Sequence, residues 1–178
     1  MKARDVALIA TQTALLIAVQ FALSFVAGIE LVTLFLAAFC FAFGYKKGII
    51  TAIAFSLLRC LLFGFFPTVI VLYLVYYPLY SVVLAFLGKL PYKNDALKLA
   101  CVTAVCLVLT VCFTMLDNLI APLIMGMKEK AWRAYFAASL PVMAAHLVNV
   151  AATVGILFLP LLKITVNLKE DFFPGTRS

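Results

Sequence analysis

Long apolar stretches separated by short polar segments run along the whole chain. A helix rises about 1.5 Å per residue and the hydrocarbon layer of a bilayer is about 30 Å thick, so about 20 apolar residues cross it. We therefore expect an all-α fold: a single domain over residues 1–178, built as an integral membrane bundle of six transmembrane helices. The second helix is short and needs tilt or flanking residues to cross. The predicted helices cover residues 6–27, 31–43, 48–63, 68–87, 97–116 and 140–162.

Glycine, proline and charged residues mark the breaks between the predicted helices, because glycine and proline do not continue a helix cheaply. Residues 44–48 predict a basic turn, residues 64–67 a turn with glycine and proline, and residues 89–95 a polar loop. Residues 117–135 predict a longer, mixed connection with several charges. Pro160 can shorten the last helix, which keeps five spans as an alternative.

The composition excludes a soluble globular protein. Hydrophobic residues make up 67% of the chain and charged residues 12%, whereas soluble domains have roughly 45–50% and roughly 25%. The first apolar run is too long for the roughly 7–15-residue core of a signal peptide, so we expect a retained helix. The five cysteines lie in apolar stretches and form no C-x-x-C pair, which supports neither a disulfide framework nor a zinc site.

The basic residues indicate the orientation in the membrane. The net charge is +7, but the basic residues form short clusters between apolar stretches, as cytoplasmic loops do, and do not indicate a nucleic-acid partner. With six spans both termini lie on the side that carries most of these clusters, and we expect that side to be the cytoplasm. Five spans would break this segregation. The cytoplasmic set is Lys2, Arg4, Lys46, Lys47, Lys89, Lys93, Lys98, Lys163, Lys169 and Arg177, and the opposite set is Lys128, Lys130 and Arg133.

A row of alanines lies along one face of the first predicted helix, since residues four apart share nearly the same face. Small residues at this spacing let a second helix approach closely within a membrane. That second helix belongs either to this chain or to another subunit. The central alanines are Ala10, Ala14 and Ala18, and Ala3, Ala7 and Ala22 extend the row.

Polar side chains inside the apolar stretches predict a binding site. Arg59 lies eleven residues into its span, roughly 16 Å deep and just past the midplane, where an unpaired charge is costly. His146 and Asn149 lie three apart on one face of the last helix. In the expected topology these groups converge on the outer leaflet, which indicates an outward-facing small-molecule site. The candidate substrate-binding residues are Glu30, Arg59, Tyr73, Tyr77, Asp117, Asn118, Trp132, His146 and Asn149.

Several of these residues also have a purely structural interpretation. Arg59 can pair with Glu30 or Asp117, and His146 can be a hydrogen-bonded core residue. The tyrosines and Trp132 can be aromatic anchors at the membrane surface, and Trp132 can also close over a ligand as a lid.

No motif for catalysis occurs in the sequence. The chain has no P-loop, no H-E-x-x-H and no G-x-S-x-G. The single histidine and the scattered carboxylates predict no metal cluster. We therefore expect neither an enzyme nor a cofactor or metal site.

Several stretches together resemble a known family. A basic six-helix membrane protein of 178 residues whose first helix carries Ala10-x-x-x-Ala14-x-x-x-Ala18 resembles the substrate-binding S components of bacterial energy-coupling factor (ECF) transporters. Residues 29–34, 44–48, 140–141 and 146–149 also resemble stretches of members of that family.

The resemblance implies a function and its partners. It implies a protein of the bacterial cytoplasmic membrane that captures a vitamin-like micronutrient from outside. The alanine face would bind a transmembrane coupling subunit that carries two ATPases, and the protein would topple in the membrane to release its cargo inward. Two other hypotheses stay open: a solitary secondary carrier driven by an ion gradient, with Asp117 or Glu30 as its proton group, and a scaffold whose polar residues only hold the bundle together.

Overall fold

A computed structural model of the chain describes residues 2–24 and 31–172. These residues form six α-helices and no strand, so the prediction of an all-helical fold is confirmed. The helices are α1 (Ala3–Leu23), α2 (Val32–Phe43), α3 (Tyr45–Phe63), α4 (Pro67–Leu87), α5 (Asp95–Ile124) and α6 (Glu129–Phe172).

Four helices in the described part of the chain are long and apolar enough to cross a membrane: α1, α4, α5 and α6. α2 is apolar but only 12 residues long, which is about 18 Å at the helical rise. α3 has 19 residues and carries Lys46, Lys47 and Arg59. The chain is therefore a multi-pass membrane protein.

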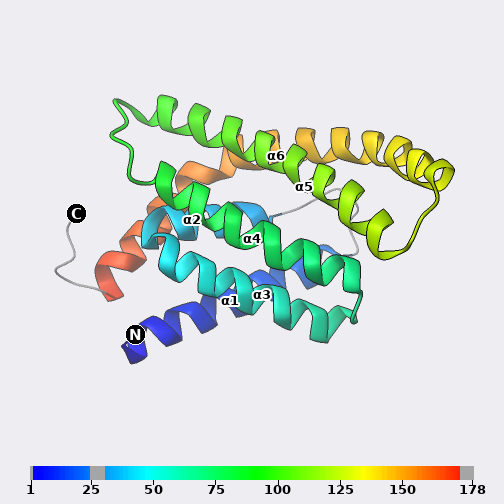
Figure 1. Cartoon of the computed structure of the whole chain (residues 1–178). Helices are drawn as coiled ribbons and strands as arrows, with labels where there is room; N and C mark the ends of the chain where they lie inside the picture. The colour runs from blue at the N-terminus through cyan, green and yellow to red at the C-terminus, as the bar shows by residue number, and fades with distance from the viewer. Residues whose placement is uncertain (1, 25–30, 173–178) are drawn as a thin grey trace.

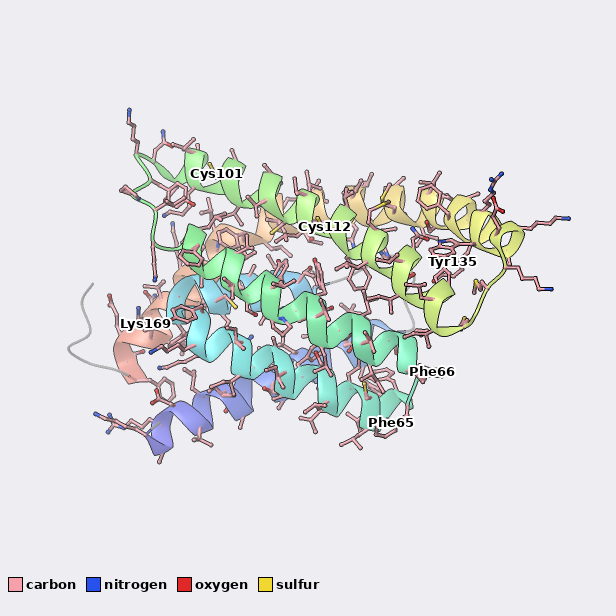
Figure 2. The ribbon with its side chains drawn as sticks, viewed as in Figure 1. Phe65, Phe66, Cys101, Cys112, Tyr135 and Lys169 are labelled. Carbon is pink, nitrogen blue, oxygen red and sulfur yellow. The ribbon has the colours of Figure 1, made fainter. Side chains whose placement is uncertain are left out.

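The helices run back and forth between two ends of an elongated bundle (Figure 1). We call one end the terminal end: it holds the start of α1, the α2–α3 turn, the connection over residues 88–94 and the end of α6. The distal end holds the α3–α4 turn, residues 64–66, and the α5–α6 turn, residues 125–128. In Figure 2, Lys169 lies toward the terminal end, and Phe65 and Phe66 lie at the distal end.

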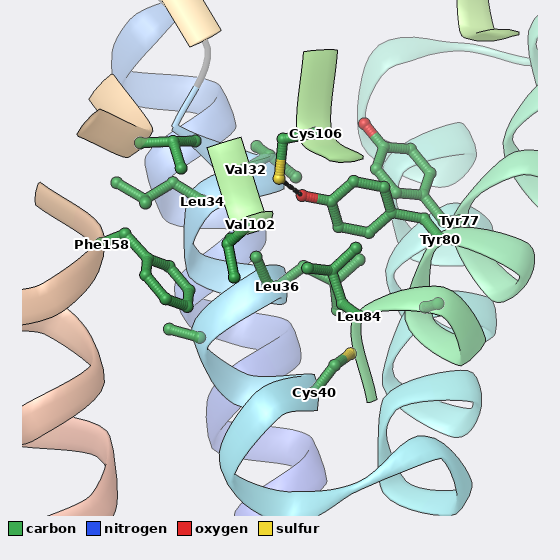
Figure 3. Packing of buried hydrophobic residues seen from close by; sticks show 14 of the residues in the cluster. Val32, Leu34, Leu36, Cys40, Tyr77, Tyr80, Leu84, Val102, Cys106 and Phe158 are labelled. Atoms are coloured by element: carbon green, nitrogen blue, oxygen red, sulfur yellow. Dashed lines mark hydrogen bonds between the residues drawn. The ribbon is translucent and has the colours of Figure 1, made fainter. Parts of the chain in front are cut away.

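α2 lies at the centre of the bundle, in contact with α1, α3, α4 and α6. Nine of its twelve residues are buried, as expected for a helix that is apolar all round. Figure 3 shows the packing of Leu34 and Leu36 of α2 among side chains of neighbouring helices. One buried polar contact also holds α2, because the Tyr80 hydroxyl of α4 donates a hydrogen bond of 2.9 Å to the carbonyl oxygen of Thr33. α2 is thus the central helix of the core, and the longer helices α1, α3, α4 and α6 pack around it.

At the terminal end α2 and α4 approach so closely that only glycine fits. A Cβ atom added at Gly88 would lie 2.6 Å from the carbonyl oxygen of Phe41, a backbone atom that cannot rotate away. We expect Gly88→Ala to lower the free energy of unfolding by about 1–3 kcal/mol, the usual cost of overpacking. Thermal unfolding in detergent micelles measures the change. Gly155→Ala is the matched control, because nothing lies within 4 Å of the added Cβ. An equal loss in both variants would contradict the close contact.

The long connection predicted over residues 117–135 is wrong. α5 continues to Ile124 and α6 begins at Glu129, which leaves residues 125–128 as the turn. Gly126, with a φ of 61°, supplies the left-handed conformation in this turn. α6 likewise continues through Pro160 to Phe172, so the expected shortening of the last helix does not occur. Packing between α5 and α6 outweighs the local preference of proline and the charged residues for a loop.

Candidate functional site

A cavity of about 320 Å³ lies at the start of α2, toward the distal end. α2 has 12 residues, and the first residue of α2 and side chains of the longer helices together line this space. We call this space the distal cavity. Its lining residues come from all six helices or their flanks: Gln20, Leu23, Ser24, Leu31, Val32, Arg59, Phe63, Tyr73, Phe113 and His146.

Arg59 supplies the cation of the distal cavity. Its guanidinium carbon lies 4.4 Å from the centre of the Tyr73 ring and 5.5 Å from the centre of the Phe63 ring. Such contacts with aromatic faces stabilise a cation by roughly 0.5–2 kcal/mol. The side chain is half-buried, and its Nε atom is buried without a hydrogen-bond partner. Aromatic rings therefore hold the guanidinium plane and leave its N–H edge for another group.

No carboxylate of the described residues forms an ion pair with Arg59. Asp117, one of the two partners considered from the sequence, instead accepts a hydrogen bond of 2.6 Å from the Tyr135 hydroxyl. Glu30, the other, lies outside the described residues. The ion pair of Arg59 with Asp117 is therefore wrong.

His146 lies between the distal cavity and a second cavity of about 280 Å³ between α5 and α6. Phe113 also lines both spaces, so the two cavities adjoin. Asp117, Tyr135 and Ser139 add polar groups to the second cavity. Arg59 thus lines one cavity and Asp117 the other, and His146 and Phe113 line both.

A contact between Asn118 and Trp132 joins α5 to α6 at the distal end. Pro122 has no N–H, so the carbonyl oxygen of Asn118, four residues earlier, lacks its helical donor. The indole N–H of Trp132 donates to this oxygen at 2.9 Å, and the Asn118 side chain donates to the Ser139 hydroxyl at 2.7 Å. Neither Asn118 nor Trp132 lines the described cavities. In this structure both residues link the two helices.

This explanation of Trp132 predicts a rescue. We expect Trp132→Phe to lower the free energy of unfolding by about 1–3 kcal/mol, because it leaves a carbonyl without its donor. In the Pro122→Ala background the loss should be at least about 1 kcal/mol smaller, since the new N–H can bond the Asn118 carbonyl. Thermal unfolding of the four proteins of this double-mutant cycle measures the coupling. Identical losses in both backgrounds would contradict the role given to Trp132.

Two further candidate residues do not line the described cavities. Tyr77 is buried in the core with its ring packed edge-on against Phe55 and Tyr73. Asn149 is half-buried, and its side-chain nitrogen is buried without a partner. Of the residues predicted from the sequence, the structure thus brings Arg59, Tyr73 and His146 together at the distal cavity, with Asp117 next to it.

Phe63 and Phe113 were not predicted as site residues, although they supply much of the aromatic wall of the distal cavity. The chain has 16 phenylalanines, and a phenylalanine in an apolar stretch gives no signal that separates a cavity wall from a lipid-facing side chain. Gln20, in contrast, can be recognised in the sequence as a candidate, because it is a polar residue inside an apolar helix. Its Oε1 atom is buried without a partner at the cavity.

The alanine row of α1 is exposed along its whole length. The face of α1 that packs on the bundle carries Ile9, Thr13 and Leu16, and the row turns away from it. The interpretation that the alanines pack against this chain's own helices is therefore wrong. The exposed row consists of Ala3, Ala7, Ala10, Ala14, Ala18 and Ala22.

Comparisons with models of protein families, with curated proteins and with solved structures gave no match. Among the described residues no group of three or more His, Cys, Asp or Glu side chains could hold a metal ion.

Proposed function

We propose that the chain is the substrate-binding S component of a bacterial ECF transporter, which captures a vitamin-like micronutrient outside the cell. The observation that carries this proposal is the distal cavity, where Arg59, Tyr73 and His146 meet. Two consecutive helices, α3 and α4, and the distant helix α6 contribute these side chains to one space. A cation without an ion-pair partner among the described residues is expensive inside a membrane unless a ligand or water meets it.

The proposal includes the orientation of the bundle. All six helices cross the membrane, with the terminal end in the cytoplasm and the distal end outside. The support is the distribution of basic residues: the terminal end bears those near the start of α1, in the α2–α3 turn, around the α4–α5 connection and near the end of α6. Positive charge of this kind favours the cytoplasmic side. The distal cavity then opens toward the outside, where an S component captures its cargo.

The proposal assigns the alanine row to the coupling subunit, a membrane protein that carries two ATPases. Ala10, Ala14 and Ala18 are exposed on α1, so a partner helix can reach them without any rearrangement of this bundle. Small side chains allow the two backbones to approach closely, which is the main source of helix association in lipid. ATP hydrolysis is the work of the partners in this scheme.

Two experiments test the proposal. Mass spectrometry of the protein purified from its native membrane should find a bound small molecule, and adding that molecule at 100 times its Kd should raise the free energy of unfolding by roughly 2.7 kcal/mol. Uptake into vesicles should require the coupling subunit, both ATPases and ATP. Uptake by this chain alone, driven by an ion gradient, would identify a secondary carrier instead. A protein without any stabilising small molecule would be a scaffold.

A further inference from the structure

We propose that the distal cavity recognises a planar aromatic monocarboxylate, with the carboxylate on Arg59 and the ring among the aromatic side chains. This inference rests on the proposed function and names its substrate class. It goes beyond that function because the charge and the shape of the ligand follow from the cavity itself.

The charges around the cavity select an anion. Arg59 is the one arginine or lysine among the described lining residues, and none of them is a carboxylate. Its Nε atom is buried and has no partner, and no described residue accepts a hydrogen bond from its guanidinium. A ligand carboxylate can satisfy two of these donors at once, since the guanidinium matches it in a bidentate pair.

The start of α2 adds to this preference. Leu31 and Val32 line the cavity, and the N-cap residue of α2, Leu31, gives the first turn no side-chain hydrogen bond. The N–H groups of a first turn have no partner within the helix, and the helix dipole places partial positive charge there. The buried core helix thus directs its positive end to the space that Arg59 also faces.

A single arginine in the described lining favours a ligand with a single negative charge. A phosphate group carries about −1.5 to −2 charges at neutral pH and is usually held by several basic groups or backbone donors. The described lining offers a single arginine, which matches a carboxylate in charge and in geometry.

The walls select a flat ring. Phe63, Tyr73 and Phe113 line the cavity. The ring centres of Tyr73 and Phe113 lie 6.1 Å apart, and the two rings are arranged edge to face. Aromatic pairs favour such offset or edge-on geometries. The volume of about 320 Å³ is near the lower limit of small-molecule sites, about 300–1,000 Å³, and fits one or two fused rings.

Matched acid and amide pairs test the inference on the purified full-length protein in detergent micelles. The probes are benzoate with benzamide and 1-naphthoate with 1-naphthamide, and phenyl phosphate serves as the phosphate arm. Thermal shift titrations give the affinities. We expect at least one acid to bind on the order of 30-fold more tightly than its amide, the size of a hydrogen bond to a charged group. The Arg59→Gln variant should bind the acid no better than the amide. Its affinity for the amide should fall far less than its affinity for the acid, because the guanidinium bonds a neutral carbonyl more weakly than a carboxylate.

The outcomes separate this inference from the proposed function. Amides that bind as tightly as the acids would overturn the inference that the ligand is an aromatic monocarboxylate. Tighter binding of phenyl phosphate than of the acids would overturn it too. Either result would leave the proposed function, capture of a small molecule, intact. An acid preference that survives Arg59→Gln would overturn the role of Arg59. If no probe binds, the substrate class is wrong, and if no molecule co-purifies either, the proposed function is wrong as well.

Discussion

Arg59→Ala is expected to weaken binding of the co-purifying ligand on the order of 100-fold while the bundle stays folded. Truncating one partner of a buried, hydrogen-bonded charge pair costs roughly 2–5 kcal/mol, much of it from the charge left unpaired. In this protein the unpaired charge would be that of the ligand, inside a cavity whose described lining holds no second arginine and no lysine. Isothermal titration with the ligand identified by mass spectrometry measures the loss.

The fold should survive because the bundle depends little on this side chain. Arg59 contacts the rings of Tyr73 and Phe63 and forms no ion pair with the described residues. The substitution removes these contacts, roughly 0.5–2 kcal/mol each. In the proposed six-span arrangement it also removes the cost of a charge inside the membrane, several kcal/mol on translocon scales. The thermal midpoint of the ligand-free variant should therefore change little or rise.

Arg4→Ala is the matched control for this experiment. Arg4 is an exposed arginine near the start of α1, at the terminal end of the bundle. Its loss should leave the affinity for the ligand unchanged. Binding to Arg59→Ala as tight as to the wild type would show that the guanidinium does not face the ligand.

The helices could be predicted from the sequence because a membrane requires long apolar segments, whose length can be read directly. The ends of α5 and α6 could not. Pro122 and the charges after it have the local preferences of a loop, and the residue that compensates the proline, Trp132, follows ten positions later on the next helix. Such a contact has no signature in the local pattern, so the extent of both helices depends on tertiary packing.

The residue types of the site could be predicted from the sequence, but not their direction. Polar and tyrosine side chains inside apolar stretches indicated Arg59, Tyr73 and His146, which the structure brings to one cavity. The direction around a helix axis depends on how the helices pack. Tyr77 lies one turn after Tyr73 on nearly the same face, yet its ring is enclosed in the core against Phe55.

The distal cavity corresponds to the short length of one helix, α2. α2 spans about 18 Å, and its 12 residues are the centre of the core. Among the described residues the distal cavity adjoins Val32 at the start of α2, while α5 has 30 residues. A short, apolar second segment among longer ones is therefore the feature of the sequence that corresponds to the cavity. From the sequence alone, the shortness of this segment predicts only that it needs tilt or flanking residues to cross a membrane.

Ala14→Leu together with Ala18→Leu is expected to reduce uptake by about tenfold or more, which corresponds to roughly 1.4 kcal/mol of lost association free energy with the coupling subunit. Both alanines are exposed on the face of α1 opposite Ile9 and Leu16. Leucine side chains there hold a partner helix away, because close approach in lipid depends on small residues. Vesicle uptake with the coupling subunit, ATPases and ATP measures the effect.

Ligand binding should be unchanged in the same variant, because neither alanine lines the distal cavity. This split between uptake and binding separates a docking face from a general loss of structure. Ala104→Leu is the matched control, since Ala104 is an equally exposed alanine on α5, away from the row. It should leave both uptake and binding intact.

Full uptake by the double variant would mean that the alanine row faces lipid and that the coupling subunit binds elsewhere. Equal losses of uptake in the double variant and in Ala104→Leu would point to an effect of bulk on the bundle surface in general.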